Sequence, residues 1–378
     1  MNNKTFVTIF PPAENIHLIK EIGMIPYLMF KNHKYESYVA SYDNGPYPYL
    51  ENELKGLKMT FIERKSKSEF LNILLYIIEN LGKIDAIQFI HFSLSKLFLI
   101  FIFKMLKNRN AKSYIKLDAN QFLKDKSYHG LKKLIVRFLM KYVDFISAET
   151  KEISNYLNTV DFFGKDVAYI PNGILRRTDK DESIEKINQI ITVGRLDDPI
   201  KSISTQVEAF KLYIENHPDS TWIFKLVGAY DTDFENYFIK TVQQNPFLND
   251  KLFLEGPVYD REKLYQYYKE SKLFLMSSLS ESFGFVYLEA LYHNCFVIST
   301  PILSAFEITN YGEFGDFYEF NDSENLAVLI DRNVTEYENK SIHSRSYILR
   351  EYDWNTIVEK IYNGIEINTR NNFNKRMI

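Results

Sequence analysis

Short apolar runs alternate with helical patterns along the chain, and this alternation constrains the fold more than any other feature. In the first half, a helix at about 68–81 precedes an apolar strand at 86–90, and a helix at about 94–107 precedes a strand at 113–118. Buried strands separated by helices indicate a parallel sheet that helices cover on both faces. Ligands of such sheets bind beyond the carboxyl ends of the strands. We therefore predict an α/β fold whose functional residues follow the strands.

The remaining strands are predicted in the same way, and they fall into two groups. They are expected at 5–10, 37–40, 57–62, 144–148 and 168–170 in the first group, and at 189–196, 223–228, 252–259, 273–276, 296–301 and 315–318 in the second. A helix is expected at about 128–142, and a helix interrupted or bent near Pro26 is expected from His17 to Phe30. A length of 378 residues suggests two domains.

The turn Pro171-Asn172-Gly173 marks the expected domain boundary, because Asn-Gly favours a turn. We assign residues 1–170 to the first domain and 171–354 to the second. A helix at about 355–370 then follows.

The loop and helix after the strand at 273–276 carry the strongest functional signal. A helix that begins at about Gly284 directs its first amides, those of Phe285 and Val286, beyond the end of the strand. Such amides and the positive end of the helix dipole form an anion site. Two carboxylates flank it, Glu281 before the helix and Glu289 within it. Since a carboxylate does not bind phosphate, each should face hydroxyl groups, and the predicted ligand is a nucleotide sugar. The alternative is a surface glutamate before a core helix, with Glu289 solvated.

The spacing of Glu281 and Glu289 resembles the Glu, seven residues, Glu motif of retaining glycosyltransferases of family 4, the group 1 type. The resemblance implies the GT-B architecture, two facing Rossmann-like domains with a cleft between them, and a final helix that crosses back to the first domain. It also implies that Glu281 lies near the donor sugar, that Glu289 binds the nucleotide ribose, and that Gly284, Phe285 and Val286 hold the diphosphate. Envelope or exopolysaccharide glycan synthesis is the expected setting.

Gly194-Arg195-Leu196 and Lys201 follow the first strand of the second domain. The resemblance implies that Arg195 and Lys201 grip the donor diphosphate, where two fixed cations would stabilise the charge of the leaving group. The spacing of these two residues is one longer than the commonest form in the family. The alternative is a pair of surface cations, although a lysine near a helix N-terminus is unfavourable without an anion.

Other candidates follow neighbouring strands. The donor-binding candidates are Gly228, Val258 and Tyr259, the last two near the nucleobase by resemblance. Asp118 stands where the family commonly has a histidine near the reaction centre, and we expect it to bind a hydroxyl group or else to cap a turn or pair with Lys116. His91 could line the cleft, but we favour a buried, satisfied histidine.

Charge is unevenly distributed along the chain. Residues 1–170 hold 24 Lys and Arg against 17 Asp and Glu, whereas the remainder holds 22 against 32. A basic first half favours an anionic partner such as a lipid diphosphate or a membrane surface. The apolar helix at 96–107 is interpreted as a core helix, and the cationic amphipathic helix at 131–141 as the better membrane candidate. No basic stripe with stacking aromatics indicates nucleic-acid binding.

The sequence shows neither a signal peptide nor a transmembrane segment, and its single cysteine, Cys295, excludes an internal disulfide. We expect a cytoplasmic protein, peripheral on the inner membrane face. No His/Cys metal cluster appears, and Arg195 and Lys201 supply the positive charge, so we expect no cofactor or metal.

We predict a retaining glycosyltransferase that uses a UDP- or GDP-sugar as donor and a glycan or lipid-linked acceptor. The proposed catalytic residues are Glu281, Asp118, Arg195 and Lys201. Two alternatives stay open: a nucleotide-sugar 2-epimerase of the same fold, with Asp118 and His91 as acid/base candidates, and a non-catalytic partner of another transferase.

Overall fold

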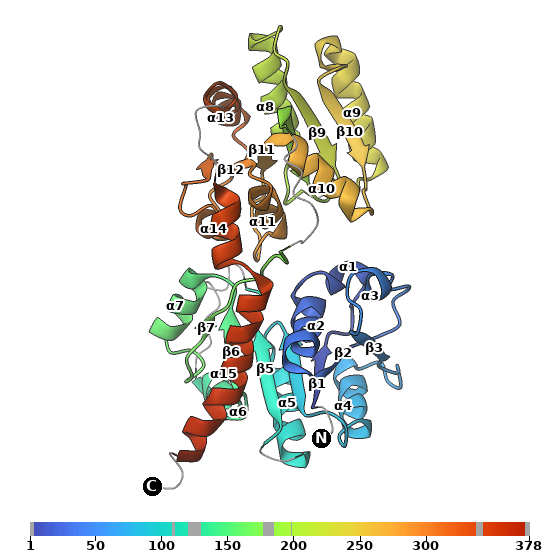
Figure 1. Cartoon of the computed structure of the whole chain (residues 1–378), viewed down its shortest axis with the longest axis vertical. Coiled ribbons are helices and arrows are strands. Elements are labelled where there is room, and N and C mark those ends of the chain that lie inside the picture. The colour runs from blue at the N-terminus through green and yellow to red at the C-terminus, as the bar shows by residue number, and fades with distance from the viewer. Residues whose placement is uncertain are drawn as a thin grey trace. The chain divides into compact units, whose positions relative to one another are not determined.

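The structure is a computed structural model that describes residues 4–107, 110–119, 130–176, 185–197, 199–337 and 343–374, with side chains up to residue 366. The chain divides into two compact units (Figure 1). Unit 1 contains Met1–Leu175 and Tyr352–Ile378, and unit 2 contains Arg176–Glu351. These bounds differ by a few residues from the predicted divisions at 171 and 354.

Unit 1 is built on a parallel sheet. Over the described residues the sheet has seven strands in the order β3-β2-β1-β4-β5-β6-β7. The strands are β1 (Thr5–Ile9), β2 (Glu36–Ser41), β3 (Lys58–Phe61), β4 (Ala86–Ile90), β5 (Lys112–Lys116), β6 (Phe145–Ala148) and β7 (Ala168–Tyr169). Every residue of β1 and β4 is buried, because helices cover both faces, and both strands are therefore nearly continuous apolar runs.

Three of the helices of unit 1 begin at a side-chain cap that the sequence supplies. The helices are α1 (Asn15–Leu18), α2 (Glu21–His33), α3 (Tyr49–Asn52), α4 (Glu69–Glu79), α5 (Leu94–Leu106), α6 (Gly130–Met140), α7 (Lys151–Thr159) and α15 (Trp354–Asn374). The side chains of Ser68, Ser93 and Thr150 accept backbone N–H groups at the starts of α4, α5 and α7. Right-handed crossovers place α4 to α7 on one face of the sheet.

The C-terminal helix α15 belongs to unit 1, where it packs beside α2 and on β5 and β6. The ring of Tyr362 stacks on His33 of α2, with 3.8 Å between ring centroids. Gly364 allows the close approach to the sheet, since a Cβ at this position would lie 2.5 Å from the ring of Phe145.

The helix break that the sequence predicts near Pro26 lies earlier in the chain. Pro26 lies inside α2, and the break falls at Ile19 and Lys20, where Lys20 has an extended backbone. A proline removes only one backbone donor from a helix. The helix continues past Pro26 because its apolar side chains, among them Ile22, Ile25, Leu28 and Met29, are buried.

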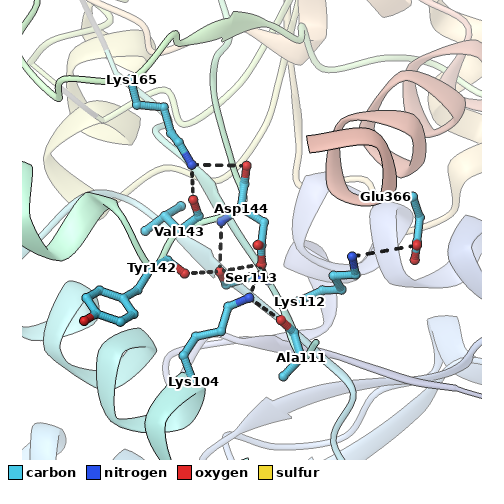
Figure 2. A network of polar contacts seen from close by, with 9 residues as sticks. All are labelled: Lys104, Ala111, Lys112, Ser113, Tyr142, Val143, Asp144, Lys165 and Glu366. Carbon is cyan, nitrogen blue, oxygen red and sulfur yellow. Dashed lines mark hydrogen bonds and ion pairs between the residues drawn. The ribbon is translucent and has the colours of Figure 1, made fainter. Parts of the chain in front are cut away.

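A polar network at the amino end of the sheet joins several elements of unit 1 (Figure 2). The Oδ2 of Asp144, just before β6, accepts hydrogen bonds from Lys104 Nζ of α5 at 2.5 Å and from the backbone N–H of Ser113 in β5 at 2.7 Å. The Ser113 hydroxyl also donates to it at 3.1 Å. Lys112 Nζ lies 3.8 Å from Glu366 of α15. Asp144 is therefore the acceptor that ties α5 to the two strands.

Unit 2 is a second Rossmann-like unit. Its described part has a six-stranded parallel sheet in the order β10-β9-β8-β11-β12-β13. The strands are β8 (Ile187–Val193), β9 (Ile223–Val227), β10 (Leu252–Gly256), β11 (Ser271–Met276), β12 (Phe296–Ser299) and β13 (Gly315–Phe317). The helices are α8 (Ile203–Asn216), α9 (Thr232–Gln244), α10 (Arg261–Glu270), α11 (Phe285–Tyr292), α12 (Leu303–Ile308), α13 (Ser323–Glu336) and α14 (Ser344–Glu351), with a short 3-10 helix at Pro246–Leu248.

Candidate functional site

Each sheet reverses its direction of strand addition at a switch point, and ligands of parallel sheets bind in the crevice there. In unit 2 the reversal lies between β8 and β11, and in unit 1 between β1 and β4. Arg195 follows β8, Glu281 follows β11, and His91 follows β4. These three residues therefore lie beside the switch points, whereas Asp118 follows β5, and Val258 and Tyr259 follow β10 at the edge of the sheet.

Lys201 and Glu281 form an ion pair at the switch point of unit 2. The two side chains are 18% and 16% exposed. The hydroxyl of Ser278 donates a second hydrogen bond to the same carboxylate oxygen at 2.8 Å. The structure thus joins two candidates that lie 80 residues apart in the sequence.

The loop that carries Lys201 is bound to the end of β11. The N–H of Leu279 donates to the Ile200 carbonyl at 2.8 Å, and the Ser277 hydroxyl donates to the Ser202 carbonyl at 2.9 Å. Gln206 of α8 donates to the Ser277 hydroxyl at 2.7 Å. These bonds hold Lys201 beside the loop of Glu281, and the sequence analysis did not identify the serines that make them.

Gly194 and Gly228 let the ends of β8 and β9 approach closely. Gly228 has a φ of 152°, and a Cβ there would lie 1.6 Å from the carbonyl oxygen of Gly194. The Gly194 N–H donates to the Val227 carbonyl at 3.0 Å. Arg195 therefore leaves the sheet from a fixed backbone, and its side chain is 67% exposed, with Nε 3.8 Å from Asp197.

Helix α11 begins beyond β11, as the sequence predicts. Gly284 precedes it with φ 81° and ψ 70°, a left-handed conformation that glycine adopts without strain. A Cβ at Gly284 would also lie 2.6 Å from the ring of Tyr287. The rings of Phe283 and Phe285 pack edge to face with 5.7 Å between centroids. The positive end of the α11 dipole lies at Phe285 and Val286.

Glu289 is mostly buried, in contrast to an ordinary solvated helix residue. The hydroxyl of Tyr268 donates to it at 3.2 Å, and Arg261 of α10 lies 4.0 Å away. Burial, and then the charge of Glu289, raise the pKa of Tyr268 well above its usual value, so Tyr268 remains a donor. Of the two nucleobase candidates beyond β10, Val258 is half-buried and Tyr259 is exposed.

His91 and Asp118 lie side by side at the ends of β4 and β5 in unit 1. The His91 Nδ1 is 3.4 Å from the Asp118 Oδ2, and both residues have positive φ, 63° and 45°. The His91 side chain is 48% exposed, so the prediction of a buried histidine is wrong. Partial loss of hydration at this half-exposed ring, and then the charge of Lys96, lower the pKa of His91, which keeps the ring neutral near pH 7.

A buried pair supports this edge of unit 1, and sequence reasoning missed part of it. Lys116 and Glu149 are both fully buried, with Nζ and Oε1 3.5 Å apart. Glu149 Oε2 accepts the backbone N–H of Ala119 at 3.0 Å, beside Asp118. Glu149 thus holds the left-handed turn at Asp118. The carboxylate that pairs with Lys116 is that of Glu149.

Glu21 is a second buried carboxyl group that the sequence did not reveal. It is 5% exposed, and its Oε2 has no hydrogen-bond partner among the residues that the structure describes. Burial, followed by repulsion from Asp118, raises its pKa from 4.5 to about 7, and the neighbouring Lys116 and Lys20 oppose the shift. The folded chain therefore holds a proton on Glu21 at mildly acidic pH.

A raised carboxyl pKa makes stability depend on pH. The folded state binds the Glu21 proton more tightly than the unfolded state, so this contribution is complete below pH 4.5 and is lost as the pH rises through about 7. We expect the free energy of unfolding of Glu21→Gln, relative to that of the wild type, to increase by up to about 3 kcal/mol when the pH is raised from 5 to 8. Urea unfolding at both values measures the gain. Glu51→Gln, at an exposed glutamate of unit 1, is the control. An equal difference at both pH values would contradict the expectation.

Two properties of the described residues bear on membrane insertion and metal binding. None of the helices in the described part of the chain has the length and apolar composition to span a bilayer. The same part of the chain contains no group of three or more His, Cys, Asp or Glu side chains placed to hold a metal ion.

Comparison with known proteins gives a consistent set of relatives. Residues 176–348 match the family model "Glycosyl transferases group 1". The chain is similar to a probable sucrose-phosphate synthase of Thermosipho melanesiensis, with 25% identity over 239 residues, 60% of this chain and 55% of that protein. It is similar in structure to a glycosyltransferase of Rickettsia africae, with 17% identity, coverage of 98% and 100%, and a TM-score of 0.73. It is also similar in structure to HepE of Anabaena in complex with UDP and glucose, with 13% identity, coverage of 96% of this chain and 99% of that chain, and a TM-score of 0.68.

The two parallel-sheet units and these structural relatives define the GT-B fold, which confirms the predicted fold class. The match to the glycosyltransferase group 1 family covers residues 176–348, which lie in unit 2. The chain spans 55% of the length of the probable sucrose-phosphate synthase to which it is similar.

Proposed function

We propose that the chain is a retaining glycosyltransferase of family 4 that transfers a sugar from a nucleoside-diphosphate sugar to a hydroxyl group of a glycan or lipid-linked acceptor. The observation that carries the proposal is the Lys201–Glu281 pair beside the switch point of unit 2. It combines a cation for a diphosphate with a carboxylate for sugar hydroxyls. The complex of HepE with UDP and glucose supports a UDP-sugar donor.

The proposed donor site assigns one part of the ligand to each group. Lys201, Arg195 and the start of α11 receive the diphosphate, because each presents positive charge. Glu281 accepts hydrogen bonds from the sugar, and Glu289, oriented by Tyr268, accepts them from the ribose. Two cations and a helix dipole supply the charge that a leaving diphosphate needs, so we propose no metal or other cofactor.

In the proposed reaction, the bond between the anomeric carbon and the leaving phosphate oxygen breaks through an oxocarbenium-like state. The acceptor oxygen bonds to the same face of the sugar, and its proton passes to the departing phosphate. Asp118, whose turn is held by Glu149, is proposed to bind a hydroxyl group of the acceptor or donor. We further propose a cytoplasmic enzyme, peripheral on the membrane, that acts in surface polysaccharide synthesis.

One observation favours a second candidate function. The neighbouring His91 and Asp118 side chains, 3.4 Å apart, provide the acid/base pair that a nucleotide-sugar 2-epimerase of this fold requires. Such an enzyme would release a nucleotide or an isomerised nucleotide sugar without any acceptor.

Incubation with UDP-glucose and other nucleotide sugars, with and without glycan acceptors, tests the proposal. A glycoside product with the donor's anomeric configuration, identified by NMR, would support retaining transfer. A 2-epimeric nucleotide sugar formed without acceptor would replace it with the epimerase. An inverted product would contradict the retaining mechanism.

A further inference from the structure

Helix α5 covers the sheet of unit 1, but it buries a lysine and exposes apolar side chains. Its Lys104 side chain points inward, is 6% exposed, and pairs with Asp144, as Figure 2 shows. Its outer face carries Phe98 and Met105, and Met105 is 62% exposed. A surface helix normally places its apolar side chains toward the core and its lysines in solvent. Lys104 therefore does not contribute a charge to the outer face of α5.

Helix α6 extends this apolar surface. Leu131 and Leu134 are 73% and 65% exposed, and Phe138 is half exposed. The ring of Phe101 in α5 lies 6.3 Å from that of Phe138, and α5 packs beside α6. The two helices thus present one continuous surface, which we call the α5–α6 patch. It consists of Phe98, Met105, Leu106, Leu131, Leu134 and Phe138.

Apolar side chains that are at least half exposed concentrate in this part of unit 1, and the neighbouring helix α4 also exposes Leu71 and Ile78, by 44% and 45%. Among the described residues, the other large apolar or aromatic side chains that are at least half exposed are Tyr259, Tyr311 and Val328, all in unit 2. These three lie on different elements of unit 2, in the loops after β10 and α12 and on α13. Isolated exposed apolar residues are normal on protein surfaces, whereas a contiguous patch indicates a binding surface.

The two helices that form the patch carry only basic charged residues. Neither Leu94–Leu106 nor Gly130–Met140 contains an aspartate or a glutamate. Lys132 and Lys141 are exposed, and Lys133 is half-buried on the same helix. Arg137 forms an ion pair with Asp161. Apolar side chains bordered by lysines match a lipid surface that is negatively charged at the headgroups and apolar beneath them.

We propose that the α5–α6 patch docks on an anionic lipid membrane, with Leu131, Leu134, Phe138 and Met105 entering the headgroup region and Lys132, Lys133 and Lys141 contacting the phosphates. The proposal deepens the peripheral location proposed above and rests on it only for its biological setting. It adds α5, interpreted from the sequence as a core helix, to the membrane surface.

Sedimentation of the full chain with lipid vesicles, without any sugar donor, tests the proposal separately from the transferase function. Vesicles of phosphatidylcholine mixed with phosphatidylglycerol should bind the chain, more weakly as salt rises, and vesicles of phosphatidylcholine alone should bind it much less. Leu131→Ser/Leu134→Ser should reduce partition at least about tenfold. Lys132→Gln/Lys133→Gln should reduce it at low salt by more than about tenfold, since each lysine contributes about fivefold.

Matched controls keep the test specific. Val328→Ser and Lys240→Gln change an exposed apolar side chain and an exposed lysine of unit 2, and both should bind vesicles as the wild type does. The melting temperature of each variant identifies any loss of folding, and because the patch is exposed we expect none. Wild-type binding by both patch variants, or equal binding to neutral and anionic vesicles, would overturn the proposal. So would a dimer that the patch variants dissociate, without vesicle binding, since a second copy would then cover the patch.

Discussion

Replacing Lys201 with alanine is expected to lower kcat/KM for sugar transfer by about 100- to 1000-fold. The substitution removes one of the cations proposed to face the leaving diphosphate. It also removes the cation that pairs with Glu281, which is 16% exposed and keeps its hydrogen bond from the Ser278 hydroxyl. An unpaired carboxylate beside the diphosphate would repel it, so the loss should appear in donor binding and in turnover.

Lys211→Ala is the matched control for this prediction. Lys211 also pairs with a glutamate, Glu208, at 2.6 Å, and it is 21% exposed, but both residues lie within α8 rather than in the loop that carries Lys201. Its loss should change kcat/KM by less than about twofold, because neither residue belongs to the proposed donor site. Lys201→Arg keeps the positive charge and should recover part of the activity. If Lys201→Ala transferred sugar at the wild-type rate, the pair would be only structural, and the proposed donor site would be wrong.

Asp144→Ala is expected to destabilise unit 1 by about 3–5 kcal/mol, because it removes one partner of a buried ion pair. Among the described residues, the change leaves the ammonium of Lys104 with the Ala111 carbonyl as its acceptor, and it removes the acceptor of the Ser113 N–H. A loss of this size should lower the melting temperature of unit 1 by roughly 10 °C, as calorimetry would show.

Two variants separate this effect from a general loss of charge. Glu79→Ala breaks the exposed pair of Glu79 with Lys65, 2.6 Å apart, and should cost less than about 1 kcal/mol. Adding Lys104→Met to Asp144→Ala removes the uncompensated buried cation and should recover part of the stability. If Asp144→Ala were no more destabilising than Glu79→Ala, the network would not have the role described.

The sequence predicts most of this fold because its strands leave a strong local signal. The run 273–276 is apolar throughout, 86–90 is apolar except for Gln88, and the helices between the strands show helical periodicity. Gly194 can be identified because it stands where a strand gives way to a loop, and Gly284 because it stands where a loop gives way to a helix. The candidate cations and carboxylates follow directly after these strands, so their places beside the switch point could be predicted too.

The remaining features depend on partners distant in the sequence. Nothing near Lys116 shows that its partner is Glu149, and nothing in the first turn of α2 shows that Glu21 is buried. The pattern of α5 could not reveal that Lys104 points inward, because Asp144 lies 40 residues later. His91 was expected to be buried as the end of a core strand, but its positive φ turns it away from the strand.

The most direct test of the central claim is a titration of the chain with UDP-, GDP-, ADP- and dTDP-sugars, in which the melting temperature is measured at each ligand concentration. Ligand at about 100 times its dissociation constant adds about 2.7 kcal/mol to the stability of the state that binds it. We predict that one nucleotide sugar raises the melting temperature by several degrees and that Arg195→Ala abolishes the shift. Arg332→Ala, which breaks a pair with Asp316 elsewhere in unit 2, should leave the shift unchanged. If none of the nucleotide sugars changed the melting temperature, the proposed donor site would be contradicted.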